Sequence, residues 1–416
     1  MGSYTNTNLR SIFTENYPGT PLLVSAPGRV NLIGEHTDYN DGYVLPAAID
    51  KVITLAIAPS GNDWCEIYSV DMDEKYRFNL KEFPLQHSGL QWPDYLLGCV
   101  TILHDAGYTM PGFHCVFQGN IPIGAGMSSS AALECGTLFA LNTLFGFGLD
   151  TLDIVKYGQK AENEYVGVQC GIMDQFASVF GRKGQVFRLD CRSLDYQYFP
   201  VITDDIKIVL CDTQISHQLA SSEYNIRREQ CEQGVRVLQA EHPEIKSLRD
   251  VSMELLQNKR QQLDPVVYRR CEYVVEENRR VLDACQALEQ GDFEQFGTLM
   301  YQSHAGLRDK YEVSCPELDL LVAATEDREE VWGARMMGGG FGGCTINLVQ
   351  SDHVEKFKTH IRQSYSGQGR QPVQFYVTSI EQGVQLLRDT SEDEFLPDPM
   401  SNLGVPEKKA VSQQSG

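Results

Sequence analysis

The sequence predicts a globular protein of two domains in which strands and helices are mixed. Its 416 residues are too many for one ordinary hydrophobic core and suit two domains of common size. A content of 42% hydrophobic and 22% charged residues is typical of a soluble globular chain. Short β-branched runs alternate with helical patterns to about residue 200, and helices then dominate from Ser221 to about Thr325.

The first part of the chain shows the clearest alternation of strand and helix patterns. Residues 1–20 are predicted to be an N-terminal arm, closed by a turn at Pro18-Gly19-Thr20-Pro21, and a first domain follows over 21–200. β-Branched and aromatic runs indicate strands there, and apolar residues at helical spacing indicate helices. The predicted strands are 52–58 and 113–117, and the predicted helices are 129–145 and 151–168.

A second domain is predicted over 201–390. Its longest helix is indicated by Val267, Cys271, Val274 and Cys285, which recur at helical intervals. Beyond 390 the chain is rich in acids, prolines, serines and glutamines and poor in apolar residues, which is typical of a disordered tail. The predicted segments are a strand at 206–211, a helix at 265–288, a glycine-rich loop at 338–343, a strand at 344–349 and the tail at 391–416.

The charge balance restricts the partners of the protein. With 35 Lys and Arg against 56 Asp and Glu, the formal net charge is −21. Binding nucleic acid or an anionic membrane requires extended basic surface, so neither is expected as the main partner. A phosphate ligand remains compatible with this charge, provided that a local loop supplies positive potential.

The cysteines and the apolar pattern indicate a compartment. The chain contains 12 cysteines but no Cys-x-x-Cys pair, and thiols dispersed in this way fit free cysteines in a reducing cytosol better than disulfides or a zinc site. The start of the chain lacks the pattern of a signal peptide, and the most apolar stretch, 137–152, is too short to span a membrane. We therefore expect a cytoplasmic protein.

The first motif with chemical character runs from Ala26 to Tyr39. A Gly-bounded turn brings Glu35, His36 and Asp38 together after an apolar strand. Carboxylates accept hydrogen bonds from sugar hydroxyls, and histidine can donate or accept a hydrogen bond. The set therefore suits a ligand with several hydroxyls. A solvated loop with a capping aspartate is the alternative. Arg29 favours a functional site over a solvated loop, because burying an unpaired guanidinium among apolar residues costs free energy.

The second motif covers Gly119 to Ala132 and ends in three serines that lead into a predicted helix. Small residues allow close approach of the backbone to a ligand, and a helix N-terminus offers free N–H groups to an anion. It is not a Walker A loop, because no Gly-Lys-Ser/Thr follows. The residues alone leave open a simpler alternative, a tight turn before a serine-capped helix.

The third motif, Gly333 to Gly343, satisfies Gly-x-Gly-x-x-Gly. The dinucleotide-binding fingerprint requires a helix after the loop, whereas a strand is predicted here, so this interpretation is rejected. The loop is expected to bring its backbone close to a ligand or to another strand.

Three further residues stand out between these motifs. Glu162 lies on the apolar face of the 151–168 helix, either at the edge of that face or coordinating something. Asp174 lies at a predicted helix start among apolar residues. Its side chain could be the helix N-cap or a partly buried base. Tyr224 begins another helix, where plain core packing is the alternative.

With these motifs in place, the sequence closely resembles the galactokinase family of GHMP small-molecule kinases over about residues 8–390. Gly34 to Asn40 resembles the galactokinase signature, whereas the two glycine loops mark all GHMP kinases. Ala125 and Met127 are mild departures from the family pattern. The resemblance implies an α+β, two-domain GHMP kinase fold with the active site in the interdomain cleft, and it assigns no function to the tail.

The resemblance also implies roles for individual residues. Asp174 matches the catalytic base, and Arg29 matches the cation beside it that stabilises the transition state and favours the carboxylate. Ser130 and Glu162 match a Mg²⁺ site. The positions that match sugar contacts are Glu35, His36, Thr37, Asp38, Gly171, Asp174 and Tyr224. Those that match the ATP phosphate loop are Gly124, Ala125, Gly126, Met127, Ser128, Ser129 and Ser130.

The implied reaction is transfer of the ATP γ-phosphate to the C1 hydroxyl of α-D-galactose by direct displacement, a step of galactose catabolism. The expected partners are galactose and MgATP, with no nucleic acid, no membrane and a monomeric state. Two alternatives stay open at this point. One is an N-acetylgalactosamine kinase with nearly the same motifs, and the other is a catalytically silent regulator that binds galactose and ATP.

Overall fold

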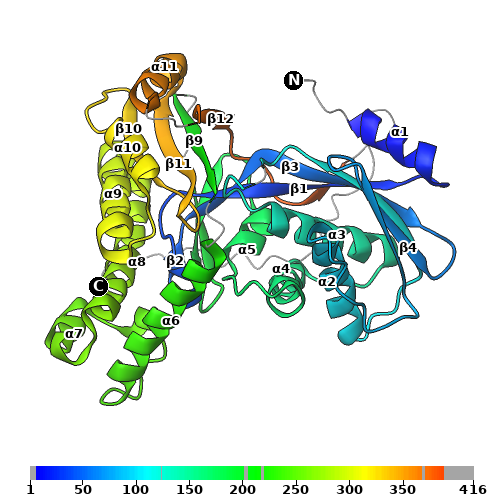
Figure 1. The fold of residues 1–416 in the computed structure, drawn as a ribbon, viewed down its shortest axis with the longest axis horizontal. Coiled ribbons are helices and arrows are strands. Elements are labelled where there is room, and N and C mark those ends of the chain that lie inside the picture. The colour runs from blue at the N-terminus through cyan, green and yellow to red at the C-terminus, as the bar shows by residue number, and fades with distance from the viewer. Residues whose placement is uncertain (1–5, 123, 201–204, 217–219, 368–370, 388–416) are drawn as a thin grey trace, which may run out of the picture.

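The computed structural model describes residues 6–122, 124–200, 205–216, 220–367 and 371–387. They form two adjoining lobes (Figure 1). The first lobe contains most of the chain to residue 200, and the second contains the helix-rich part from residue 205. The expected tail at 391–416 lies outside the described residues. The domain boundaries at 20/21, 200/201 and 390/391 stay predictions.

The first lobe is built on a mixed sheet with the strand order β13-β1-β3-β6-β4-β5. Its pairs are antiparallel except for β4 and β6, which run parallel. These strands are β1 (Leu22–Asn31), β3 (Pro46–Pro59), β4 (Trp64–Ser69), β5 (Glu74–Asn79), β6 (Phe113–Gly119) and β13 (Gln385–Leu386). The strands expected at 52–58 and 113–117 are confirmed within β3 and β6.

Both faces of this sheet are covered (Figure 1). The helices below it are α2 (Trp92–Asp105), α3 (Ser129–Phe145), α4 (Thr151–Lys160) and α5 (Met173–Phe180), and α1 (Asn6–Asn16) lies on the opposite face. Val24 belongs to the core beneath the sheet, whereas its neighbour Leu23 packs with Phe13 of α1. Alternate side chains of a strand point to opposite faces, so the apolar side chains of β1 pack both into the core beneath the sheet and against α1. The expected N-terminal arm is therefore a docked helix over Asn6–Asn16.

The expected helix at 151–168 is divided in the structure. Its first part is α4, and Ala161–Val166 forms a π-helical turn that ends at Gly167 in the left-handed region (φ 89°). π-Helical turns are uncommon and often occur at functional sites. Glu162, one of the predicted site residues, lies in this turn. The expected helix at 129–145 is confirmed with the same bounds as α3.

The second lobe has an antiparallel sheet with the order β10-β11-β9-β12, packed against helices. Its strands are β9 (Ile206–Ser216), β10 (Val331–Met336), β11 (Gly342–Gln350) and β12 (Gln374–Thr378). Its helices are α6 (Ala220–Gln239), α7 (Met253–Asn258), α8 (Pro265–Gln290), α9 (Phe293–Gly306), α10 (Pro316–Ala323) and α11 (Val354–Tyr365). The strands expected at 206–211 and 344–349 and the helix expected at 265–288 are confirmed.

The lobes are joined in three ways. The strands β2 (Tyr43–Val44), β7 (Gln185–Asp190) and β8 (Tyr196–Pro200) form a small sheet that packs on α8. After β12 the chain returns to the first lobe, where β13 pairs with β1. The largest core cluster also continues from the first lobe into the second, where it includes Val281 of α8 and Ile346 of β11. The two lobes are therefore packed against each other over a shared interface.

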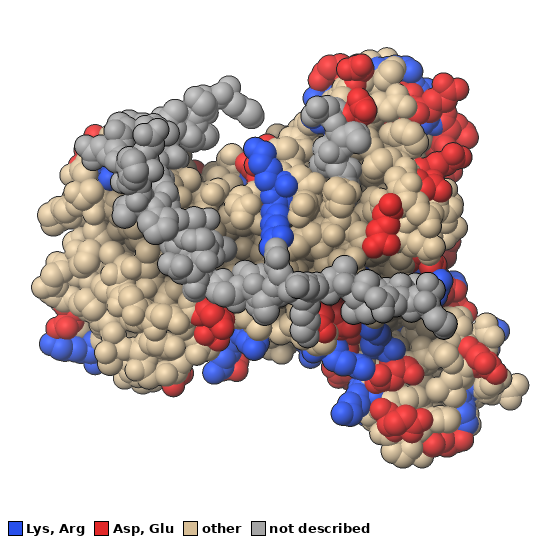
Figure 2. Space-filling view, turned by 180° about the vertical axis from the view of Figure 1, so that it is seen from behind, with Lys and Arg blue, Asp and Glu red and all other residues tan. Residues whose placement is uncertain are grey.

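The described surface carries both acidic and basic side chains, and the cysteines are unpaired. On the described residues of the face in Figure 2, acidic and basic side chains are interspersed over the second lobe rather than gathered into a basic patch. All 12 cysteines are free thiols in the described part of the chain, ten buried and two, Cys170 and Cys191, half-buried. Within the described ranges, none of the helices combines the length and apolar character needed to cross a membrane.

Candidate active site

A cavity of about 460 Å³ opens between the lobes, where α5 and α6 approach one another in Figure 1. This volume is in the range of small-molecule sites. Among the described residues that line it, Arg29 is the only Lys or Arg. The predicted site residues that line it are Arg29, Glu35, His36, Asp38, Glu162, Gly171, Asp174 and Tyr224, and glycines 338 and 339 of the third motif join them.

Asp174 and Arg29 form a bidentate ion pair in this cavity. Nε of Arg29 donates to Oδ1 of Asp174 over 2.7 Å, and Nη2 donates to Oδ2 over 2.8 Å. Burial alone would lower the pKa of Arg29, but the charges of Asp174, Glu35 and Asp38 and the hydrogen bonds to Asp174 together outweigh it, and the pKa is raised. The Arg29 side chain is 6% exposed and that of Asp174 is 26% exposed. Both groups line the cavity, and the carboxylate is the more exposed of the two.

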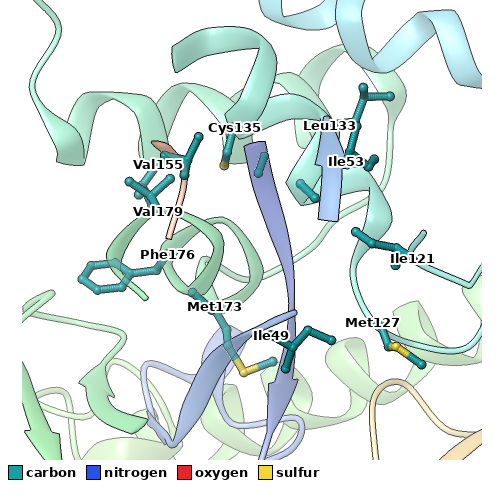
Figure 3. Packing of buried hydrophobic residues seen from close by; sticks show 14 of the residues in the cluster. Ile49, Ile53, Ile121, Met127, Leu133, Cys135, Val155, Met173, Phe176 and Val179 are labelled. Atoms are coloured by element: carbon teal, nitrogen blue, oxygen red, sulfur yellow. The ribbon is translucent and has the colours of Figure 1, made fainter. Parts of the chain in front are cut away.

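Buried neighbours fix the two segments that meet at Asp174. Met173 and Phe176 on α5 point into the core, and so does Met127 of the second motif (Figure 3). Because these neighbours are anchored, Asp174 and Ser128 are turned toward each other, and the Ser128 hydroxyl donates to Oδ2 of Asp174. Ser128 is in the left-handed region (φ 58°).

The second motif lies against the strand that carries Arg29. The Arg29 N–H donates to the carbonyl of Met127 over 3.1 Å, and Nη1 donates to the carbonyl of Gly126 over 2.5 Å. A side chain at Gly28 could not be accommodated, since its Cβ would lie 2.4 Å from the Met127 carbonyl oxygen. The first and second motifs are thus locked together through backbone contacts.

The start of α3 is open to an anion. Ser128 is its N-cap, yet among the described residues no side chain caps the first turn, because the Ser128 hydroxyl is directed to Asp174. The serine-capped helix considered as an alternative is therefore wrong. Free N–H groups at the positive end of a 17-residue helix form a site suited to phosphate.

The signature turn is held to the glycine loop of the second lobe. Oε1 of Glu35 accepts from the Gly338 N–H over 2.8 Å and from Nη2 of Arg335 over 3.1 Å. His36 contacts the Gly339 carbonyl through Nε2 at 3.2 Å and the Tyr39 hydroxyl through Nδ1 at 2.7 Å. Because a carbonyl only accepts, Nε2 carries the proton and Nδ1 accepts from Tyr39. Burial lowers the pKa of His36 to about 3, so the imidazole is neutral.

Tyr224 and Thr37 occupy different positions around this turn. The Tyr224 ring packs on His36, with centroids 5.4 Å apart, and lines the cavity. Thr37 is wholly buried and does not belong to the described cavity lining. Its hydroxyl lies 2.8 Å from the Gly34 carbonyl and 2.6 Å from the Tyr43 carbonyl. Thr37 therefore stabilises the turn through these backbone contacts and not by facing the cavity.

Asp38 and Gly171 are in tight contact. A Cβ on Gly171 would lie 1.9 Å from Oδ2 of Asp38 and 2.3 Å from its Cγ. Contacts that close do not occur in folded proteins, so the Asp38 side chain would have to shift. The glycine is needed so that the Asp38 carboxyl can occupy its place in the cavity.

We predict that Gly171→Ala raises the KM for the sugar by roughly ten- to a hundredfold, as expected for overpacking that costs about 1–3 kcal/mol. The KM for the nucleotide should stay unchanged, because the added methyl group meets Asp38 and not the second motif. Steady-state kinetics with each substrate varied would measure this. Gln169→Ala, an exposed change in the same loop, is the control. An unchanged sugar KM in Gly171→Ala would contradict the prediction.

Glu162 and Ser130 meet close to Asp174. Burial and the Asp174 charge raise the pKa of Glu162, while hydrogen bonds from Cys170, Ser130 and Gln175 oppose the rise. The Ser130 hydroxyl and the Glu162 carboxylate thus converge as two oxygen donors. No group of three or more His, Cys, Asp or Glu side chains in the described residues could hold a metal. This donor set fits Mg²⁺, which is commonly bound by one or two protein oxygens together with substrate phosphates.

Several supporting residues were not found from the sequence. Glu277 accepts from the Gly34 N–H over 2.9 Å, and Asn278 accepts from the Tyr43 N–H over 2.9 Å. The Tyr273 hydroxyl donates to the Glu35 carbonyl over 3.0 Å. Asn278 continues the apolar spacing of Val267, Cys271 and Val274, and a polar residue on that stripe could have been noticed.

Arg335 is the clearest omission. It is wholly buried, and its guanidinium donates to the Leu32 carbonyl over 2.7 Å, to the Asn31 carbonyl and to Glu35. It is the only charged residue of the third motif. The argument applied to Arg29, that an isolated guanidinium in an apolar run requires partners, applies equally to Arg335.

Family comparisons match three regions of the chain. Residues 94–182 match the GHMP kinases N terminal domain, and residues 284–367 match the GHMP kinases C terminal family. Residues 11–59, which include the signature turn, match the galactokinase galactose-binding signature.

Whole-chain relatives extend these matches. A galactokinase of Roseiflexus sp. is 40% identical over 384 residues, which is 92% of this chain and 97% of that protein. A galactokinase of Thermotoga maritima is 42% identical over 364 residues, covering 88% and 99%. The crystal structure of Lactococcus lactis galactokinase complexed with galactose has a TM-score of 0.88 at 36% identity, covering 92% and 99%. Methanococcus jannaschii mevalonate kinase shares the fold alone, with a TM-score of 0.63 at 18% identity and coverage of 87% and 99%.

Proposed function

The chain belongs to the galactokinase family of GHMP kinases, and we propose that its cleft transfers the γ-phosphate of ATP to the C1 hydroxyl of α-D-galactose. The observation that carries this proposal is the placement of Asp174. Its carboxylate is paired with the buried Arg29 and reaches a cavity that the galactose signature turn also lines. The base, the cation and the sugar-binding turn are thus within one site.

In the proposed mechanism, Asp174 accepts the proton of the C1 hydroxyl as that oxygen attacks the γ-phosphorus. The bond between the γ-phosphorus and the β–γ bridging oxygen breaks in the same step, and ADP leaves. Arg29 fixes the orientation of both carboxylate oxygens through its two N–H donors. It also places a positive charge beside the developing negative charge, where a preorganised dipole or cation lowers the barrier most. Ser128 donates a further hydrogen bond to Asp174 and restricts its rotation.

Galactose is proposed to be bound by the residues around the signature turn. The carboxylates of Glu35 and Asp38 accept hydrogen bonds from sugar hydroxyls, and the neutral His36 and Tyr224 form the adjoining wall. Gly171 leaves space for Asp38. Thr37 takes part indirectly, because its hydroxyl holds the turn from behind.

ATP is proposed to place its phosphates on the loop from Gly124 to Ser130 and on the open N-terminus of α3. Ser130 and Glu162 would hold Mg²⁺, which when bound supplies positive charge to the phosphates. Glu162 is held in place by Gln175, whose Nε2 donates to Oε2 of Glu162 over 2.7 Å. This local arrangement allows an acidic protein to bind a polyphosphate.

A panel of sugars in an ADP-release assay tests the proposal. Galactose should be turned over with the highest kcat/KM, and glucose and N-acetylgalactosamine much more slowly. Faster turnover of N-acetylgalactosamine would assign the chain to that sugar instead. Binding of galactose without ADP release would identify a regulator and overturn the catalytic assignment.

The charge state of Asp38 predicts a pH dependence for galactose binding. Burial, together with the Asp174 charge, raises the pKa of Asp38 to about 7. If the carboxylate form accepts sugar hydroxyls, protons compete with galactose below that pH. Galactose affinity should therefore fall as the pH drops below about 7, by up to about tenfold per pH unit. Calorimetric titration with galactose from about pH 6 to 8 would measure this.

Asp38→Asn is the control for this pH dependence. Because the amide does not titrate, its galactose affinity should be weaker but should not change over the same pH range. A wild-type affinity that is constant from about pH 6 to 8 would contradict the assignment of Asp38 as the titrating acceptor.

We also propose that the protein acts in the cytoplasm as a monomer. The support for the compartment is the set of 12 free thiols, since a reducing environment keeps such thiols unpaired. Sedimentation of the purified protein would test the monomeric state.

A further inference from the structure

Behind the proposed metal site lies a buried carboxyl group that the transfer step does not use. Glu134, on α3, is wholly buried, and so is Gln175, which follows Asp174 on α5. Glu162, in the π-helical turn, is 6% exposed. These three polar side chains come from three different elements and meet beneath the cavity, although their surroundings are part of the apolar core.

The amide of Gln175 connects the two carboxyl groups. Its Nε2 donates to Oε2 of Glu162 over 2.7 Å and to Oε2 of Glu134 over 3.1 Å. An amide nitrogen has two protons, and these two bonds are the shortest of the three contacts that Nε2 makes, the third being to Sγ of Cys170 at 3.8 Å. With both protons engaged, the Gln175 side chain cannot rotate without breaking a hydrogen bond in a dry environment.

Packing alone does not explain a carboxyl group at position 134. Its neighbours on α3, Leu133 and Cys135, are apolar core residues, and an apolar side chain of similar length would fill the same volume. Burying a polar group is unfavourable unless it is hydrogen-bonded, and Oε1 of Glu134 has no hydrogen-bond partner among the described residues. The side-chain contacts that distinguish Glu134 are therefore those to the Gln175 amide and to the Glu162 carboxyl.

We propose that Glu134 is a positioning residue for the metal site, acting through Gln175 to hold the Glu162 carboxylate in its binding orientation. Gln175 and Cys170 both donate to Oε2 of Glu162, so the other oxygen, Oε1, is free of these two donors. Removing Glu134 releases one end of the Gln175 amide, and Glu162 then loses the partner that fixes its rotation. Hydrogen-bonded partners of metal ligands commonly affect metal affinity in this way. The inference rests on the proposed role of Glu162 as a metal ligand.

Mn²⁺ binding to the enzyme–ADP complex, followed by the electron paramagnetic resonance of free Mn²⁺, tests this without turnover. Glu134→Met removes the acceptor at similar side-chain length and should weaken Mn²⁺ binding by about ten- to a hundredfold. Glu134→Gln keeps an oxygen that accepts from Gln175 and should restore most of the affinity. The KM for galactose should be nearly unchanged in both variants, and thermal unfolding would establish that both are folded.

Two further variants separate the possible failures. Glu162→Gln should weaken Mn²⁺ binding; if it does not, the metal assignment is wrong and the inference falls with it. If Glu162→Gln weakens binding but a folded Glu134→Met does not, the positioning role alone is overturned. The double variant Glu134→Met/Gln175→Met should lose less Mn²⁺ affinity than the two single losses added together, because Glu134, Gln175 and Glu162 belong to one hydrogen-bonded cluster. Fully additive losses, or equal losses in Glu134→Met and Glu134→Gln, would also overturn it.

Discussion

Asp174→Ala is expected to abolish phosphoryl transfer to galactose while leaving nucleotide binding largely intact. The carboxylate is the proposed proton acceptor, and loss of a positioned general base costs about 10²- to 10⁴-fold in rate. Among the described residues of the nucleotide loop, Ser128 is the one that hydrogen-bonds Asp174 through its side chain, so ATP should still bind. ADP release at saturating substrates would measure the fall in kcat, and calorimetry with ADP would measure binding.

Stability has to be measured in the same variant. Arg29 is only 6% exposed, and an unpaired buried charge is destabilising. Because Asp174 keeps 26% of its side-chain surface exposed, the cost should be at the low end of the range for broken buried pairs, about 3 kcal/mol or less. Asp105→Ala, an exposed acid with side-chain exposure of 59%, is the matched control. Substantial residual turnover in a folded Asp174→Ala would leave positioning as the main source of catalysis.

Arg29→Met should have the second largest effect, a fall in kcat of about 10²- to 10³-fold, as for loss of a preorganised group that stabilises the transition state. The change removes the charge beside the reacting oxygen and frees both oxygens of Asp174 from their N–H donors. It also removes the bond from Nη1 to the Gly126 carbonyl. The KM for galactose should change much less than kcat.

Arg29→Lys distinguishes charge from geometry. Lysine restores a cation but not the planar pair of donors that the carboxylate receives from arginine. Activity should therefore recover only partly, to a level between Arg29→Met and wild type. Arg279→Met, at an exposed helix position with 74% side-chain exposure, is the control. Full activity in Arg29→Lys would show that positive charge alone accounts for the role of this residue.

Helix starts and glycine loops were predictable because their causes are local. The bounds of α3 follow from three serines before an apolar run, and Asp174 was expected at the start of a helix that the structure confirms as α5. The rejection of a dinucleotide fold also held, since β11 follows the third motif. Periodicity over a few turns of chain was sufficient for each of these.

The π-helical turn at Ala161–Val166 could not be predicted in this way. The apolar spacing continued smoothly through Glu162, and the pattern indicated an unbroken α-helix to residue 168. The carboxylate of Glu162 in this turn accepts a hydrogen bond from Gln175 of another helix. Periodicity contains no information about such a partner.

The sequence by itself determined which chemical groups are present: the base, the arginine, the signature turn and the serine loop. It also determined the short-range geometry that glycine and helix-terminus chemistry dictate. The tertiary structure decided how these groups are held, since Gly34 is bound by Glu277 and Glu35 by Arg335 across the lobe interface. It also decided that Ser128 bonds Asp174 instead of capping α3. Such contacts join residues far apart in the chain, and only the packing of one lobe on the other brings their donors and acceptors within reach.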